Sequence, residues 1–312
     1  MKTLKCLRAL LLTPIFAWAT VVPAPSTLPA YSVTRLPAGL FPVDINNSGT
    51  ILGPMSTNFG EHCFLLQHGT VTDLGTLTGP NGQFCSPARL NASGQVTGWS
   101  VLATGEQRAF LYFQGVMKEL GTLAGNHSAG NVINDGGMVV GFSEFGSGDA
   151  RHAFAYRHCS LTDLGTLGGG FSSANAVNNQ GVIVGESTIS LDPLSDTHPF
   201  IFKKGVMTDL GSLGGSIASA LAINERGQVA GYATLPDGSY HLFLYQNETF
   251  SDLGSLGGNF ATVFGINNQG TIVGIAEPVD SPIVGVLYAR GQLMTINSLI
   301  DPELGWHIIV GG

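Results

Sequence analysis

Charged residues are scarce in this 312-residue chain and make up only 11% of it. Lys and Arg number 13 against 21 Asp and Glu, so the net charge is -8 and no basic patch is available to neutralise a phosphate backbone. The composition therefore predicts no nucleic-acid partner. Several catalytic signatures are also missing, because the sequence has no G-x-S-x-G, H-E-x-x-H, P-loop, paired C-x-x-C, EF-hand or S-x-D-x-G-x-x-W pattern.

Long apolar runs are missing everywhere except at the N-terminus. Residues 1–19 contain three basic residues, an apolar run from Ala9 to Trp18 and the small-residue site Ala17-Trp18-Ala19, which is the pattern of a secretory signal peptide. We predict cleavage after Ala19 and a secreted or cell-surface protein, with the periplasm as a further compartment; an uncleaved anchor is the alternative. Residues 20–30 are Pro-rich and are expected to form an extended leader, so residues 31–312 form the single repeat domain.

Cysteine is rare, with four residues in the chain. Cys6 lies in the predicted signal, which leaves Cys63, Cys85 and Cys159 in the mature protein. An odd number allows at most one internal disulfide and one free thiol in an oxidising compartment. Cys63 and Cys85 are the nearer pair, and the sequence leaves open whether they are bonded.

Glycine, in contrast, is abundant: its 44 residues are about twice the usual share. Such a composition favours many short strands joined by tight turns. Most of these glycines belong to a unit that occurs six times and begins with Asn, followed by Gly three residues later and by a second Gly four residues after that. The Asn residues are 43 to 46 residues apart: Asn46, Asn91, Asn134, Asn178, Asn224 and Asn267.

Two further features recur in fixed order within each unit. A His-x-Phe triplet lies in an apolar segment of four units, at His62, His152, His198 and His241. Arg108-Ala109-Phe110 replaces it in the second unit, and Val284-Gly285-Val286 replaces it in the sixth. An acidic residue then begins an acidic-Leu-Gly-Thr/Ser-Leu segment in five units, at Asp73, Glu119, Asp163, Asp209 and Asp252.

The repeated unit predicts four short strands. Asn-x-x-Gly between two apolar stretches is a hairpin signal, because Asn and Gly tolerate the positive φ of tight turns. The triplet segment supplies a third strand and the acidic segment a fourth. Four strands in about 45 residues match one blade of a β-propeller. We therefore predict an all-β chain with six four-stranded blades, and an open β-solenoid as the alternative.

The chain ends add two more predicted strands. Tyr31–Leu36 resembles a lone fourth strand, and Trp306–Val310 resembles a first strand. Together they would extend the six blades by a partial seventh, and how the ring closes is left open.

The repeat resembles the extracellular HAF-repeat family, which is named for the triplet that stands intact as His152-Ala153-Phe154. The resemblance covers about residues 31–300, and residues 152–170 are its most characteristic stretch. It implies a secreted or surface-exposed bacterial repeat protein and brings no established reaction.

Because the His and acidic residues recur in equivalent positions, we expect them to have a structural role within each blade. A metal site needs ligands that converge on one ion, whereas equivalent positions on different blades are separated by a whole blade. The rings are therefore expected to be hydrogen-bonded within their own blades. The acidic residues could form a cation-binding ring around a central channel, but carboxylates that accept backbone N–H bonds beside a turn are the expected arrangement. No catalytic, metal or cofactor site is predicted.

Two functions remain. The first is a non-enzymatic binding or structural scaffold for an unknown extracellular glycan, protein or surface polymer; the protein is expected to be a monomer with no membrane span after signal cleavage. The alternative is a propeller enzyme acting on an extracellular polysaccharide or ester. Its chemistry would be placed in two longer loops that break the repetition, residues 144–152 and 187–198.

Overall fold

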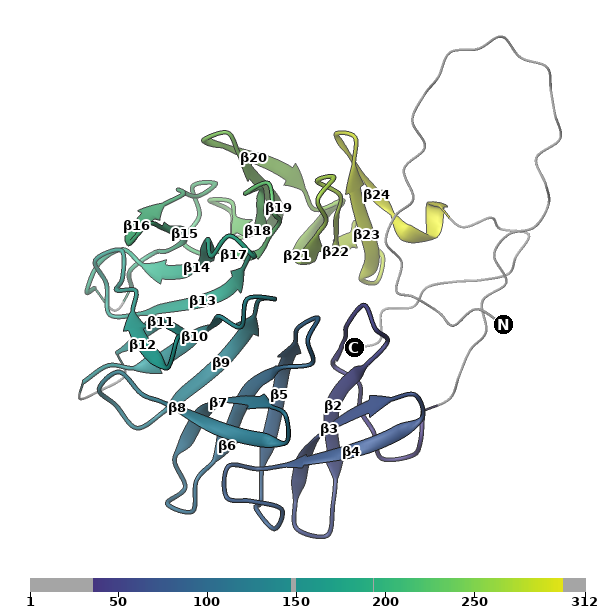
Figure 1. Cartoon of the computed structure of the whole chain (residues 1–312). Helices are drawn as coiled ribbons and strands as arrows, with labels where there is room; N and C mark the ends of the chain where they lie inside the picture. The colour runs from purple at the N-terminus through teal and green to yellow at the C-terminus, as the bar shows by residue number, and fades with distance from the viewer. Residues whose placement is uncertain (1–35, 147–149, 193, 300–312) are drawn as a thin grey trace, which may run out of the picture.

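The computed structural model describes residues 36–146, 150–192 and 194–299. The predicted signal and leader and the strand at Trp306–Val310 lie outside these residues, as does all of Tyr31–Leu36 except Leu36. The described part forms six antiparallel sheets of four strands each, and every sheet follows the chain order. The sheets are arranged around a common centre (Figure 1), so the propeller prediction is confirmed and the open solenoid is not the arrangement.

We number the sheets as blades 1 to 6 along the chain. Blades 1 and 2 consist of β1 (Asp44–Ile45), β2 (Ile51–Ser56), β3 (Glu61–Gln67), β4 (Thr70–Gly75), β5 (Cys85–Leu90), β6 (Val96–Val101), β7 (Gln107–Phe113) and β8 (Val116–Gly121). Blades 3 and 4 consist of β9 (Ser128–Ile133), β10 (Val139–Glu144), β11 (Arg151–Arg157), β12 (Ser160–Asp163), β13 (Ser172–Val177), β14 (Ile183–Thr188), β15 (Thr197–Lys203) and β16 (Val206–Asp209). Blades 5 and 6 consist of β17 (Ala218–Ile223), β18 (Val229–Thr234), β19 (Tyr240–Gln246), β20 (Thr249–Gly254), β21 (Gly257–Ile266), β22 (Ile272–Pro278), β23 (Val284–Ala289) and β24 (Gln292–Thr295), and a 3-10 helix follows at Ile296–Leu299.

The Asn-x-x-Gly turn joins the first two strands of each blade. In blade 4, Asn178 Oδ1 accepts hydrogen bonds from the backbone N–H groups of Gln180 and Val182, at 3.1 and 3.0 Å. Gly181 in this turn has φ +78°, which glycine adopts without strain. The second glycine, Gly185, has a different role, because a Cβ there would collide with the carbonyl oxygen of Ser173 on the first strand. The turn chemistry and a close strand approach thus account for the glycine spacing.

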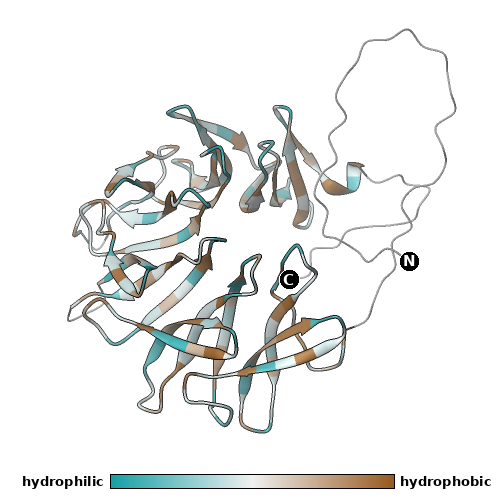
Figure 2. Ribbon diagram, viewed as in Figure 1, coloured by the Kyte–Doolittle hydropathy of each residue, from teal (hydrophilic) through white to brown (hydrophobic). Residues whose placement is uncertain are grey.

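The hydrophobic core is divided among the junctions between blades. Each of five clusters of buried side chains joins one blade to the next, from the junction of blades 1 and 2 to that of blades 5 and 6. Burial of a Val, Leu or Phe side chain contributes ~1.5–3 kcal/mol before conformational entropy is subtracted, so neighbouring blades stabilise one another. Figure 2 shows hydrophilic residues at several hairpin tips that point toward the middle of the ring.

A disulfide joins the first two blades. Cys63 on β3 and Cys85 on β5 are bonded, with their Cα atoms 5.4 Å apart and both side chains fully buried. Cys159 is a free, exposed thiol. The described residues include no helix of the length and apolarity needed to cross a membrane.

Candidate functional site

The repeated His and Asp residues pair with each other within their own blades. The His Nδ1 atom donates to a carboxylate oxygen at 2.8–2.9 Å in each of four pairs: His62–Asp73, His152–Asp163, His198–Asp209 and His241–Asp252. Each Asp also accepts the backbone N–H of the glycine two residues later, at 2.7–2.8 Å. Each pair therefore joins the third strand to the end of the fourth strand or to the turn directly after it.

The second blade uses a different pair at the same place. Arg108 replaces the histidine, Glu119 replaces the aspartate, and Arg108 Nε lies 3.0 Å from Glu119 Oε1. The two partners are 11 residues apart in every pair. This constant offset, and the joint exchange of both partners in one blade, is the sequence signal of the pairing that our sequence analysis missed.

The acidic residues of these pairs do not line the central pocket, so they form no cation-binding ring there. Asp163 and Asp209 end the fourth strand of their blades, at the outer edge of the sheet. Within the described residues, no group of three or more His, Cys, Asp or Glu side chains is arranged to hold a metal ion.

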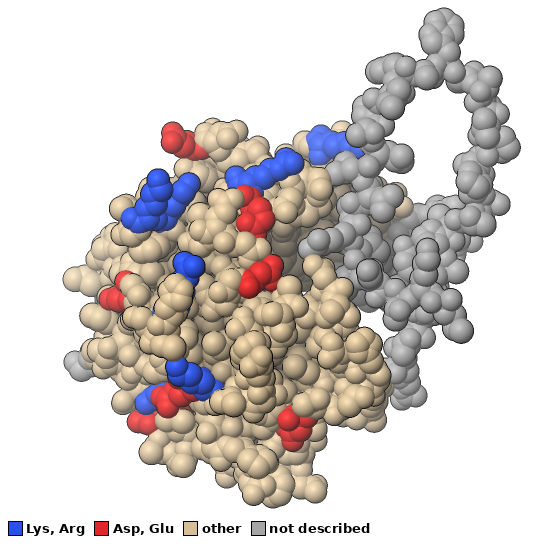
Figure 3. Space-filling model, viewed as in Figure 1, with Lys and Arg blue, Asp and Glu red and all other residues tan. Residues whose placement is uncertain are grey.

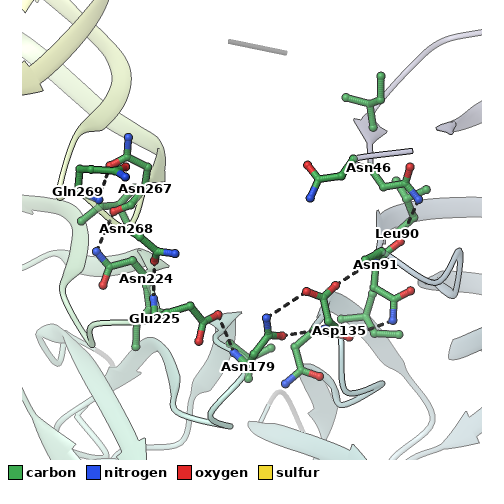
Figure 4. Close-up of a pocket in the computed structure, with 18 residues that line it drawn as sticks. Asn46, Leu90, Asn91, Asp135, Asn179, Asn224, Glu225, Asn267, Asn268 and Gln269 are labelled. Carbon is green, nitrogen blue, oxygen red and sulfur yellow. Dashed lines mark hydrogen bonds between the residues drawn. The ribbon is translucent and has the colours of Figure 1, made fainter. Parts of the chain in front are cut away.

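A polar pocket of about 530 Å³ lies where the innermost strands of the six blades meet. Its apolar part comes from the last residue of each innermost strand: Ile45, Leu90, Ile133, Val177, Ile223 and Ile266. The rest of the lining, all of it polar except Ala92, comes from the turns that follow: Asn46, Asn47, Asn91, Ala92, Asn134, Asp135, Asn179, Asn224, Glu225, Asn267, Asn268 and Gln269. Figure 4 labels most of these side chains around the pocket.

The repeated Asn residues connect neighbouring blades beside this pocket. Each side-chain Nδ2 donates to the backbone carbonyl oxygen of the equivalent Asn in the next blade, at 2.8–3.1 Å, and we call this chain of bonds the Asn ladder. It runs from Asn46 through Asn91, Asn134, Asn178 and Asn224 to Asn267. The sequence predicted a turn role for these residues, and the structure adds a contact between blades.

The residue after each Asn forms a second set of contacts between blades. The backbone N–H of Asp135 donates to Asn179 Oδ1, that of Asn179 to Glu225 Oε1, and that of Glu225 to Asn268 Oδ1, at 2.9–3.0 Å. The N–H of Ala92 donates to Asp135 Oδ1 at 3.0 Å. These side chains face the pocket, yet part of their hydrogen-bonding capacity is already used to hold its wall.

Charge in the pocket is of one sign. Of the described residues that line it, only Asp135 and Glu225 are charged, and none is Lys or Arg. Asp135 also accepts a bond from Asn179 Nδ2 at 3.0 Å. Figure 3 shows one face of the ring, where charged side chains are few and separated by large uncharged areas. The lining therefore offers amide groups and two carboxylates to a ligand.

The two longer loops lie at the opposite ends of the blades from the Asn turns, because they join the second strand to the third. Two of their acidic side chains accept backbone N–H groups. Glu144 accepts the N–H groups of Asn126 and His127, both at 3.0 Å, and Asp192 accepts that of Leu194 at 2.9 Å. Residues 147–149 and 193 of these loops lie outside the described residues.

One acidic residue lies between blades 4 and 5 and was missed by the sequence analysis. Glu186 on β14 follows the second glycine of its unit, where other blades have Trp99, Phe142, Tyr232 and Ile275. Burial raises the pKa of the Glu186 carboxyl, although a hydrogen bond with Ser219 opposes this. Burial, followed by the charge of Glu186, also raises the pKa of Tyr232. Glu186 does not line the central pocket.

No family model matches the chain, and no curated protein does. Similar folds occur among solved structures. The propeller domain of the Trilobed protease from Pyrococcus furiosus, described as having an open velcro topology, is 10% identical with a TM-score of 0.54 over 82% of this chain and 84% of that domain. A puromycin-hydrolyzing peptidase from Mycobacterium tuberculosis is 14% identical with a TM-score of 0.53 over 82% of this chain and 44% of the peptidase.

A third similar structure is TolB from Acinetobacter baumannii, 12% identical with a TM-score of 0.48 over 79% of this chain and 60% of TolB. The chain thus spans less than two thirds of TolB and of the peptidase. At these identities the likeness to the protease domain and the peptidase is one of fold alone.

Proposed function

We propose that this protein is a secreted or cell-surface binding scaffold whose central pocket binds a neutral, polyhydroxylated ligand such as a segment of a glycan. The observation that carries the proposal is the lining itself: a ring of amide and carboxylate groups above six aliphatic side chains. Amides and carboxylates hydrogen-bond well to hydroxyl groups, and aliphatic side chains suit the C–H faces of a sugar ring. The two carboxylates disfavour an anionic ligand.

Secretion is supported by two independent features. The N-terminal sequence has the three regions of a signal peptide, and the Cys63–Cys85 disulfide suits an oxidising compartment. The resemblance to HAF-repeat proteins points to the same location.

The residues that line the pocket and the hydrogen bonds of the repeated His residues favour a scaffold role over catalysis. Among the described residues, the pocket lining contains no Ser, Cys, His or Lys, and its two acids, Asp135 and Glu225, accept backbone N–H groups of neighbouring blades. The four repeated His residues are hydrogen-bonded to Asp in their own blades. The enzyme alternative depends on the two longer loops, whose acids Glu144 and Asp192 accept local backbone N–H groups.

The test is a binding screen of the secreted protein against neutral, amino and uronic-acid oligosaccharides, followed by calorimetry on those that bind. Asn268→Ala and Glu225→Gln change the pocket, and Asp192→Asn in a distant loop is the matched control. Loss of one ligand hydrogen bond is worth ~0.5–1.5 kcal/mol, so each pocket variant should weaken binding about two- to ten-fold while the control does not.

The proposal fails if no oligosaccharide binds, or if binding depends on the loop residue and not on the pocket. Product formed from a polysaccharide or ester would favour the enzyme.

A further inference from the structure

The junction between blade 6 and blade 1 differs from the other five. A buried cluster of side chains fills each of the five junctions along the chain. Among the described residues, no such cluster joins blade 6 to blade 1. The Asn ladder likewise ends at Asn267, with no further blade to receive it in the described part of the chain.

Exposure of one repeated position shows which face lacks a neighbour. The residue before the second glycine of each unit packs against the next blade and is 0% exposed in blades 1 to 5: Leu52, Thr97, Val140, Val184 and Ala230. Its equivalent in blade 6, Val273, is 39% exposed. Phe264 on β21 is 64% exposed, whereas Leu221 at the same place in blade 5 packs into the cluster with blade 6. Blade 6 therefore presents an apolar face built to be covered by a following strand.

We propose that the C-terminal segment Trp306–Val310 covers this face as the first strand of a partial seventh blade. In earlier junctions the first strand of the following blade lies over the first three strands of the preceding one, as β17 contacts β13, β14 and β15. The segment would lie over β21, β22 and β23 in the same way. This inference does not depend on which ligand the pocket binds.

Chain length and composition make this segment the occupant. Residues 296–305 lead from β24 to Trp306, and their number is similar to that of residues 76–84, 164–171 and 210–217, which make the same connection in earlier blades. The 3-10 helix at Ile296–Leu299 spans ~8 Å, and six further residues can reach ~20 Å, which together exceed the ~15 Å across four strands. Apart from His307, the sequence Trp-His-Ile-Ile-Val is apolar on both faces, which suits a strand that lies between two blades.

Cysteine cross-linking on the full chain tests the proposal. Val273→Cys is combined with His307→Cys or with Ile308→Cys in a Cys159→Ser background and treated with a short bis-maleimide. Neighbouring residues of a strand point to opposite faces, so one pair should cross-link within the chain far faster than the other. Val206→Cys, at 61% exposure on blade 4, replaces Val273→Cys in the control and should give no cross-link with either residue.

Hydrogen exchange supplies a second measurement. Deletion of residues 306–312 should speed exchange in β22 severalfold and leave β14 unchanged. Cross-links only between two chains would mean that a second copy covers the face and would overturn the proposal. Equal cross-linking at positions 307 and 308, no cross-linking at either, or unchanged exchange after deletion would do the same.

Discussion

Replacing Asn178 by Ala removes three hydrogen bonds at a side chain that is only 3% exposed. Two are local, from the N–H groups of Gln180 and Val182 to Oδ1, and one joins blades, from Nδ2 to the carbonyl oxygen of Asn224 at 3.1 Å. At ~1 kcal/mol for each bond, the free energy of unfolding should fall by ~3 kcal/mol. The Val182 N–H is buried and loses its side-chain partner, so we expect the loss of unfolding free energy to be no smaller than this sum.

Two companion variants separate the local part from the part between blades. Asn178→Asp keeps the Oδ1 acceptor and removes the Nδ2 donor. Asn267→Ala removes the same local bonds, to Gln269 and Thr271, at the end of the Asn ladder. Asn267→Ala should therefore cost ~1 kcal/mol less than Asn178→Ala.

The assay is guanidinium unfolding followed by circular dichroism and by tryptophan fluorescence. Coincidence of the two signals checks that unfolding is cooperative enough to yield one free energy. A cost below ~0.5 kcal/mol for Asn178→Ala would refute the argument, because surface substitutions commonly fall in that range. Equal costs for Asn178→Ala and Asn267→Ala would refute the contribution of the contact between blades.

Three further predictions concern the disulfide, the buried acid and the exchanged ion pair. Reduction, or Cys63→Ser with Cys85→Ser, should lower the free energy of unfolding by ~3 kcal/mol as measured by melts with and without reductant; no change would contradict a stabilising cross-link. Burial raises the folded-state pKa of Glu186, so its protonated form favours folding, and stability should fall as the pH rises from the ordinary carboxyl pKa through the raised one. Glu186→Gln should remove that slope in melts recorded from pH 4 to 8. Arg108→His and Glu119→Asp should each cost up to ~1 kcal/mol, and the double variant should recover the loss by restoring a His–Asp pair; additive losses in a double-mutant cycle would argue against the pair.

The fold could be predicted because the residues that form each turn recur in the sequence at a nearly constant spacing. An Asn whose side chain caps its own turn and a Gly with positive φ are local requirements, so they recur in every unit regardless of what surrounds the blade. The His–acid pairs were within reach for the same reason, since both partners recur with one offset.

The pocket could not be predicted in this way. Asp135, Asn179 and Glu225 follow the repeated Asn at equivalent places, but the three do not all have the same charge or the same length. They come together only because the ring brings six turns to one centre, which is a property of the arrangement of blades. Glu186 was missed because it is unusual only by comparison with the apolar and aromatic residues that other blades have at the same position.

In the described part of the chain, the buried clusters form a series in which each cluster joins two consecutive blades. Loss of an internal blade would break two buried clusters, whereas loss of a terminal blade breaks one, so unfolding should begin at an end of the chain. Blade 1 is held to blade 2 by the Cys63–Cys85 bond, and blade 6 has no such cross-link among the described residues. We therefore expect the disulfide to set the direction of unfolding, from the sixth blade toward the first.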